Sequence, residues 1–236
     1  MDHDTEKFYK DLDNEIWNML RNQGYQENPE EARECIELMA PYVNRGIDFD
    51  DPEKKARFLT LMQNILNRMM PGTQMFVRDC LLSDEVSALY VPKTILREPG
   101  FVDASERHGG LLCTHRVMII SNHMIPLPES KGWGAYVAPR NSYYKVLANY
   151  VSGVTGKRLI LLLHLPLDGS WKIFEKVDIG DLGGIDIEKT SIERFEKRHI
   201  EPNIPELATV EWLKRCIRPV GIDDKNIPYP LEDQLT

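Results

Sequence analysis

The chain has 236 residues, 42% of them hydrophobic and 28% charged, with a formal net charge of −8. These proportions are typical of a globular protein that can bury a sizeable core, so they exclude wholesale disorder. No uncharged apolar run reaches the roughly 18 residues of a membrane span, and the acidic start Met1-Asp2-His3-Asp4 does not resemble a secretory signal, so we expect a cytoplasmic protein without a membrane partner.

Residues 1–72 have the pattern of a helical unit. Apolar side chains recur at three- and four-residue spacing over 5–23, and Gly24 follows at the position of a left-handed C-terminal cap. The runs Asn28-Pro29-Glu30 and Asp51-Pro52-Glu53 each combine a capping side chain, a proline and an acid, which is how helices begin. We therefore expect three helices, near 5–23, 28–40 and 51–70, packed as a small bundle.

Residues 73–218 change to short β-rich runs with helices at the end. The pattern predicts strands over 75–82, 86–91, 111–122, 133–138, 158–165 and 171–177, with Asp168-Gly169 as a hairpin turn. It predicts a helix over 141–151, a capping box at Thr190-Ser191-Ile192-Glu193, and a helix over 206–217.

The predicted fold is α+β, with an N-terminal three-helix unit packed on a mostly antiparallel sheet of five or six strands and with C-terminal helices. We divide the chain into a helical unit (1–72), an α+β domain (73–218) and an extended C-terminal tail (219–236), whose three prolines and four acids suggest an extended conformation.

Charge is distributed unevenly along the chain. Residues 1–72 carry 15 acids and 9 bases, whereas the window 107–158 holds seven bases and a single acid, Glu129. Basic and aromatic side chains that alternate in this way can hold phosphates and stack on planar groups. The predicted ligand-binding residues are Arg107, Arg116, Trp133, Tyr136, Arg140, Lys157 and Arg158. The competing interpretation is that acids of the same molecule neutralise these bases.

Three polar side chains of the run 109–123 are candidate catalytic residues: Cys113, His115 and His123. In one straight strand, Cys113 and His115 lie on one face about 6.6 Å apart, close enough for the imidazole to activate the thiol. His115 and His123 lie roughly 26 Å apart in the same geometry, too far to share a metal ion. No metal-binding or cofactor-binding motif occurs in the sequence, so we name no metal site and leave the cofactor unknown.

Three functions stay open at this stage, and whether the chain is an enzyme stays open with them. The first is binding of an anionic ligand, such as a nucleotide or a nucleic-acid backbone, with or without its hydrolysis by His115 or His123 as general base. The second is a non-enzymatic inhibitor, immunity or adaptor factor whose acidic N-terminal helices bind a basic protein. The third is a thiol-dependent enzyme that uses Cys113.

Overall fold

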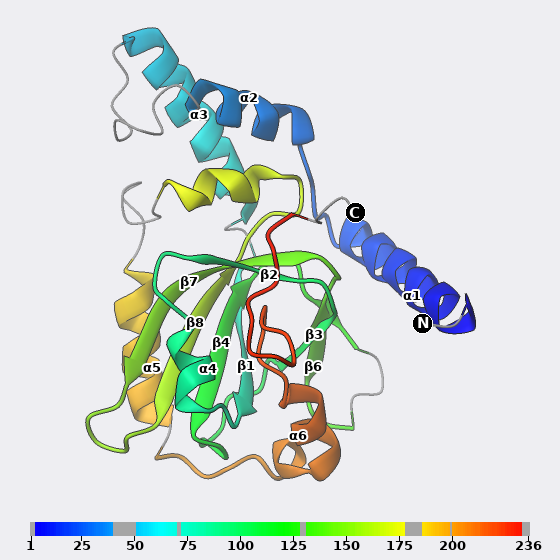
Figure 1. The fold of residues 1–236 in the computed structure, drawn as a ribbon, viewed down its shortest axis with the longest axis vertical. Coiled ribbons are helices and arrows are strands. Elements are labelled where there is room, and N and C mark those ends of the chain that lie inside the picture. The colour runs from blue at the N-terminus through cyan, green and yellow to red at the C-terminus, as the bar shows by residue number, and fades with distance from the viewer. Residues whose placement is uncertain are drawn as a thin grey trace.

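A computed structural model describes residues 3–39, 51–69, 72–127, 131–177, 186–198 and 200–232. It contains one eight-stranded sheet with helices against both faces (Figure 1). The predicted α+β class, with helices at both ends of the chain, is therefore confirmed. The predicted sheet of five or six strands was too small.

The helices are α1 (His3–Asn22), α2 (Pro29–Met39), α3 (Pro52–Met69), α4 (Asp84–Ala88), the 3-10 helix η2 (Ser170–Glu175), α5 (Ile187–Arg198), the 3-10 helix η4 (Pro205–Ala208) and α6 (Val210–Cys216). The strands are β1 (Gln74–Cys80), β2 (Ile95–Glu98), β3 (Val102–Ser105), β4 (His115–Ser121), β5 (Ile125–Pro126), β6 (Ala135–Ala138), β7 (Ser142–Val151) and β8 (Arg158–His164).

The three N-terminal helices begin and end where their capping residues lie. The side chain of Asn28 accepts the backbone N–H of Glu31 at 3.1 Å, and that of Asp51 accepts the N–H of Glu53 at 2.9 Å. Gly24 ends α1 with φ of 87°, a left-handed conformation that only glycine adopts without strain. These boundaries confirm the three helices predicted from sequence.

Helix α1 nevertheless packs apart from the other two. Its buried residues Ile16 and Leu20 form a cluster with Ile125 and Val137 on β5 and β6, whereas α2 and α3 contribute to the core on another part of the sheet. Figure 1 shows α1 projecting along one end of the sheet, away from the α2–α3 pair. The expected small bundle of three helices is therefore divided into one helix and a pair.

The strand order is β2-β7-β8-β4-β1-β3-β6-β5. Every pairing is antiparallel except β4 with β8, which run parallel with Val117 opposite Ile160. A parallel pair needs a long connection between its strands, and the chain between β4 and β8 supplies β5, β6 and β7. The sheet is therefore mostly antiparallel, as predicted.

The core lies on both faces of the central strands. On β4, Met118 and Ile120 face α2, α3, α5 and η2, while Val117 and Ile119 face the side covered by α4 and the C-terminal segment. Residues of both sets are at most 5% exposed. Strands buried on both faces have continuous apolar sequences instead of alternating ones, which is why the β4 and β8 runs were readily found.

The predicted helix over 141–151 and the predicted strand over 86–91 both have the wrong type, the first because of tertiary contacts and the second because of a local helix cap. Residues 142–151 form β7 and not a helix, since Tyr144 and Val146 are fully buried between β2 and β8. Residues 84–88 form α4 and not a strand, because the hydroxyl of Ser83 accepts the N–H of Val86 and caps a helix there. The short strands β2, β3 and β5 were missed.

The predicted hairpin at Asp168-Gly169 and the predicted strand over 171–177 are also wrong. The carboxylate of Asp168 accepts the backbone N–H of Ser170 at 3.1 Å, a local turn that opens the 3-10 helix η2 instead of a strand. Trp171, Ile173 and Phe174 are buried from this helix in the core. Helix α5 begins at Ile187, earlier than the capping box at Thr190 predicted, because Asp186 accepts the N–H of Lys189.

The C-terminal segment is bound to the sheet over its described length. The hydroxyl of Tyr90 donates to Val220 O at 3.0 Å and accepts Val220 N–H at 2.8 Å, while Tyr143 donates to Leu231 O at 2.9 Å. Val220 and Ile222 are buried in the core. The segment after α6 therefore covers one face of the sheet (Figure 1).

Candidate functional site

The central basic residues serve local contacts instead of a common hollow. Arg116 is 1% exposed, and its Nε and Nη2 donate to the two carboxylate oxygens of Asp79 at 2.7 and 2.9 Å. Its guanidinium also binds the carbonyl oxygens of Gly109 and Gly110 at 2.8 and 3.1 Å. The positive charge of Arg116 is thus compensated by the Asp79 carboxylate inside the protein.

The other predicted ligand-binding bases have internal partners as well. Arg107 binds Gly132 O and pairs with Glu206, Arg140 donates to Pro99 O, Lys157 donates to Leu111 O, and Arg158 donates to Asn149. The predicted aromatic platforms are packed: the ring of Trp133 lies 5.5 Å from that of Trp212, and the ring of Tyr136 lies 4.8 Å from that of Phe76. Acids of the molecule therefore neutralise Arg116 and Arg107. Arg140, Lys157 and Arg158 donate to uncharged oxygens instead and keep their charge.

Gly109 and Gly110 allow another segment of the chain to pack closely against them. A Cβ added at Gly110 would lie 2.0 Å from the carbonyl oxygen of Glu201, and one added at Gly109 would lie 2.6 Å from the side chain of Ile204. The N–H of Gly110 also donates to Pro202 O at 3.0 Å. The close backbone approach that these glycines permit is therefore made by the chain's own C-terminal part.

Cys113 and His115 do not form an activated pair. Burial, and then the Asp79 carboxylate, raise the pKa of the Cys113 thiol, which opposes formation of the nucleophilic thiolate. The Nδ1 of His115 is 2.8 Å from the hydroxyl of Thr114, and burial followed by the Arg158 charge lowers the pKa of His115. No hydrogen bond joins the two side chains in the described part of the chain.

His123 belongs to a buried stack that sequence reasoning did not foresee. Strand β4 ends at Ser121, and the ring of His123 lies 3.7 Å from that of His164 and 4.9 Å from that of Tyr25. Burial lowers the pKa of His123 to about 4 and that of His164 well below its usual range. The parallel pairing of β4 with β8 places these two histidines side by side at the ends of both strands.

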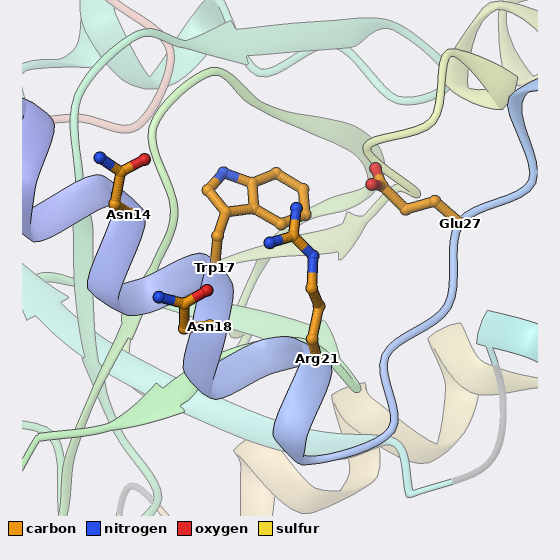
Figure 2. A pocket seen from close by; sticks show the side chains of 5 residues that line it. All are labelled: Asn14, Trp17, Asn18, Arg21 and Glu27. Atoms are coloured by element: carbon orange, nitrogen blue, oxygen red, sulfur yellow. The ribbon is translucent and has the colours of Figure 1, made fainter.

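An open cavity of ≈ 310 Å³ lies on α1, outside the region predicted from sequence. It is lined by Asn14, Trp17, Asn18 and Arg21 of α1 and by Glu27 of the following loop (Figure 2). Positions 14, 17, 18 and 21 share one helix face because residues three and four apart are neighbours. The opposite face, with Ile16 and Leu20, packs on the sheet and so holds the cavity face outward.

The cavity combines an aromatic surface with charges of both signs. The guanidinium carbon of Arg21 lies 5.7 Å from the centre of the Trp17 ring, and Figure 2 shows Glu27 facing this pair across the cavity. Burial, and then the negative charge of Asp168, raise the pKa of Glu27, while Arg21 lowers it. Within the described ranges, these five side chains make no hydrogen bond or ion pair with protein groups, so their polar groups are available to a ligand.

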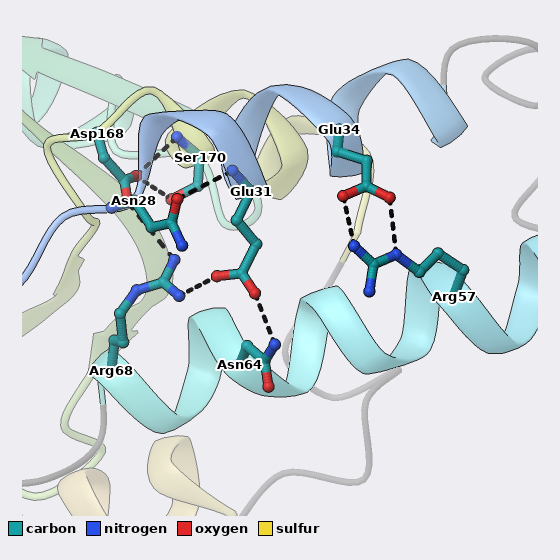
Figure 3. Close-up of polar contacts among 8 residues, drawn as sticks. All are labelled: Asn28, Glu31, Glu34, Arg57, Asn64, Arg68, Asp168 and Ser170. Atoms are coloured by element: carbon teal, nitrogen blue, oxygen red, sulfur yellow. Dashed lines mark hydrogen bonds and ion pairs between the residues drawn. The ribbon is translucent and has the colours of Figure 1, made fainter.

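A buried polar network fixes the loop that carries Glu27. The backbone N–H of Asn28 donates to Asp168 at 3.1 Å, and Asp168 is 3.6 Å from the guanidinium of Arg68. Arg68 also pairs with Glu31 of α2, and Figure 3 shows its guanidinium lying between the Glu31 and Asp168 carboxylates. The network therefore ties the loop after α1 to α2, α3 and η2.

The N-terminal helices were proposed to bind a basic protein through their acidic residues, but two of these residues already bind partners within the molecule. Glu31 binds Arg68 and Asn64, and Glu34 binds both Nε and Nη2 of Arg57 (Figure 3). Neutralising these two carboxylates would disturb the α2–α3 contact as well as any partner interface.

Two kinds of site are not found in the described part of the chain. No three or more His, Cys, Asp or Glu side chains gather there to hold a metal ion. None of the helices in those ranges combines the length and apolar character that crossing a bilayer requires.

Comparisons with known proteins give only distant similarity. No protein-family model and no curated protein matches the sequence. The fold is similar to that of Plx2a, an ADP-ribosyltransferase toxin from Paenibacillus larvae, at 12% identity and a TM-score of 0.34, over 67% of this chain and 96% of the toxin.

Two further structures have comparable similarity. Exoenzyme S from Pseudomonas aeruginosa, whose structure contains a 14-3-3 protein and carba-NAD, matches at 13% identity and a TM-score of 0.36, over 77% of this chain and 90% of its own. An ADP-ribosyltransferase from Clostridium botulinum matches at 15% identity and a TM-score of 0.33, over 68% of this chain and 96% of its own. Scores at this level assign neither a family nor an activity to the chain.

Proposed function

We propose that this protein binds a nucleotide in the cavity formed by Asn14, Trp17, Asn18, Arg21 and Glu27. The observation that carries the proposal is that this cavity presents an indole, a guanidinium, a carboxylate and two carboxamides, none of them hydrogen-bonded to another described residue. The central bases, by contrast, are already bound to protein oxygens.

Each group of a nucleotide has a matching side chain in this cavity. The indole of Trp17 is a surface for stacking a base, an interaction worth about 1–3 kcal/mol. The guanidinium of Arg21 suits a phosphate, because it is always charged and donates in a planar fork. The carboxylate of Glu27 can accept ribose hydroxyls, a role that acidic residues have in other nucleotide sites.

The remaining groups and the size restrict the ligand. The carboxamides of Asn14 and Asn18 each have donors and an acceptor for the edge of a base. A volume of ≈ 310 Å³ lies at the small end of the usual range for ligand pockets, about 300–1,000 Å³. The cavity therefore fits a mononucleotide better than a dinucleotide, and its single cation fits a single phosphate.

Tryptophan fluorescence can test this proposal directly. Trp17 is half-buried, whereas Trp133, Trp171 and Trp212 are buried, so a ligand that stacks in the cavity should change the emission of Trp17. We expect saturable quenching by AMP or GMP. Affinity for AMP should fall as salt is raised, because the Arg21 charge is exposed to screening, while affinity for adenosine should not change.

Substitution of the cation provides the matched control. Arg21→Gln should weaken the affinity for AMP about 10- to 100-fold, the usual value of a charge-assisted hydrogen bond, and leave the affinity for adenosine unchanged. Arg33→Gln removes an exposed helical arginine outside the cavity and should not change either affinity. Equal AMP affinity in the Arg21→Gln variant and the unaltered protein would overturn the assignment of the phosphate.

A further inference from the structure

A second cavity lies beside α6 and shares no residue with the α1 site. It has a volume of ≈ 170 Å³ and lies between α6 and the end of β1, where it is lined by Cys80, Cys113, Val210, Leu213 and Ile217. The surface is almost wholly apolar. A cavity of this size can hold one ring or branched side chain, since an apolar cavity of about 150 Å³ admits benzene.

Apolar surface continues outside this cavity. Leu81, Val210 and Ile217 are 66%, 67% and 58% exposed, and all three belong to its lining. Helix α6 buries Trp212 and Cys216 against the sheet side, so Val210 and Ile217 form a second apolar face. No described residue covers that face. Contiguous apolar surface of this kind is typical of protein interaction sites.

The charge beside the cavity is positive. The carboxylate of Asp79 lines it but is bound to the Arg116 guanidinium, so it presents little net charge. Lys214 also lines the cavity, is exposed, and has no ion pair with a described residue. A partner that complements this edge would carry negative charge next to an apolar group.

We propose that this cavity docks an acidic peptide segment of a partner protein, which inserts one side chain of the size of leucine, methionine or phenylalanine and places its carboxylates against Lys214. A peptide suits the site better than a small amphipathic molecule because it would also cover the exposed rim of Leu81, Val210 and Ile217. The inserted side chain would act as the anchor of the interface.

Cys113 provides a local probe of this docking. It is half-exposed at the cavity, whereas Cys35, Cys80 and Cys216 are buried. The folded protein should therefore react with iodoacetamide first at Cys113, which mass spectrometry of the intact chain and its peptides can confirm. A bound peptide should slow this reaction.

The probe peptide is Ac-Asp-Glu-Leu-Glu-Asp-NH2. We expect the Cys113 alkylation rate to fall to a plateau as this peptide is added, with a much smaller effect when its leucine is replaced by serine or its acids by lysine. Val210→Asp should abolish the protection, and Lys214→Gln should weaken the affinity for the peptide about tenfold. Val210 starts α6, where an aspartate also favours the helix, so loss of protection would not reflect unfolding.

Val154→Asp is the matched control, because Val154 is 82% exposed in the turn after β7 and does not line the cavity. It should leave the protection intact. Three results would overturn the proposal: no protection by the acidic peptide, equal protection by the lysine peptide, or protection by octanoate alone.

Discussion

At the scale of single residues, the charges that matter most to this fold are those that solvent does not reach. The Arg116–Asp79 pair is buried and bidentate, and the Leu112 N–H donates to the same carboxylate at 3.2 Å. Removing one partner of such a pair leaves an uncompensated buried charge. Each partner therefore depends on the other at the junction of β1 and β4, where Asp79 lies opposite Arg116.

Replacement of the buried carboxylate tests this assignment. Asp79→Asn should lower the free energy of unfolding by about 3–5 kcal/mol, as measured by urea denaturation. Asp103→Asn breaks the more exposed pair with Arg215 and should cost at most about 1 kcal/mol. If the free energy of unfolding fell by the same small amount in both variants, Arg116 would not depend on Asp79 for its counter-charge.

The buried histidines predict a pH dependence of stability. In the unfolded chain, histidine titrates near 6.5, whereas burial lowers the pKa of His123 to about 4 in the folded protein. Between these values the unfolded state binds more protons, so stability is present above about pH 6.5 and is lost as the pH falls toward 4, by about 3 kcal/mol for His123 alone.

Urea denaturation at several pH values can measure this effect. The midpoint should fall steadily from pH 7 to pH 5, and His123→Phe should reduce the slope because it removes one of the two titrating rings. A midpoint independent of pH over this range would contradict neutral, buried imidazoles.

At the scale of elements, the sequence predicted best where the signal is local. Capping residues and helical spacing located α1, α2 and α3, and the continuous apolar runs located β4 and β8. The β7 segment was assigned to a helix because its strand character comes from pairing with β2 and β8, which are distant in sequence. The same limit applies to His123 and His164, whose contact depends on the parallel pairing of β4 and β8.

The residues of the proposed site were harder to predict than the fold. Charge counting selected Arg116 and its neighbours, but a sequence does not show which bases an internal oxygen already binds. The α1 cavity did leave a signal, because Asn14, Asn18 and Arg21 follow one polar face and an aromatic residue, Trp17, lies at its edge beside the apolar face.

Contacts between elements also explain one glycine. Gly110→Ala would place a methyl group 2.0 Å from the carbonyl oxygen of Glu201, and overpacking of backbone should cost about 3 kcal/mol. Gly153→Ala is the control, since nothing lies within 4 Å of the added carbon. Thermal unfolding should show a clear loss for the first variant and little change for the second; a Gly110→Ala protein of full stability would mean that the two segments are not in contact.

At the scale of the whole molecule, the C-terminal segment closes one face of the sheet, and Tyr90 attaches it through two hydrogen bonds to Val220. Tyr90→Phe would leave the N–H and carbonyl of Val220 without their partner, which should cost about 1–3 kcal/mol and increase proteolysis after α6. Tyr229→Phe, on the same segment, removes a hydroxyl that has no hydrogen bond to a described residue and should be neutral. Equal protease resistance in both variants would show that the segment is held by other contacts.

The two proposed surfaces lie on different helices and share no residue, one on α1 at the β5–β6 edge of the sheet and one on α6 beside β1 (Figure 1). A nucleotide and a protein partner could therefore be bound at the same time. The α1 cavity is the one for which a ligand class is proposed from polar and charged side chains that make no hydrogen bond or ion pair with a described residue.

The indole N–H resonances of the four tryptophans test this claim most directly when AMP is added to the isotope-labelled protein. The signal of Trp17 should shift progressively to saturation, while those of Trp133, Trp171 and Trp212, which are buried away from the cavity, should stay in place. A Trp17 signal that does not move at millimolar AMP would contradict a nucleotide site on α1.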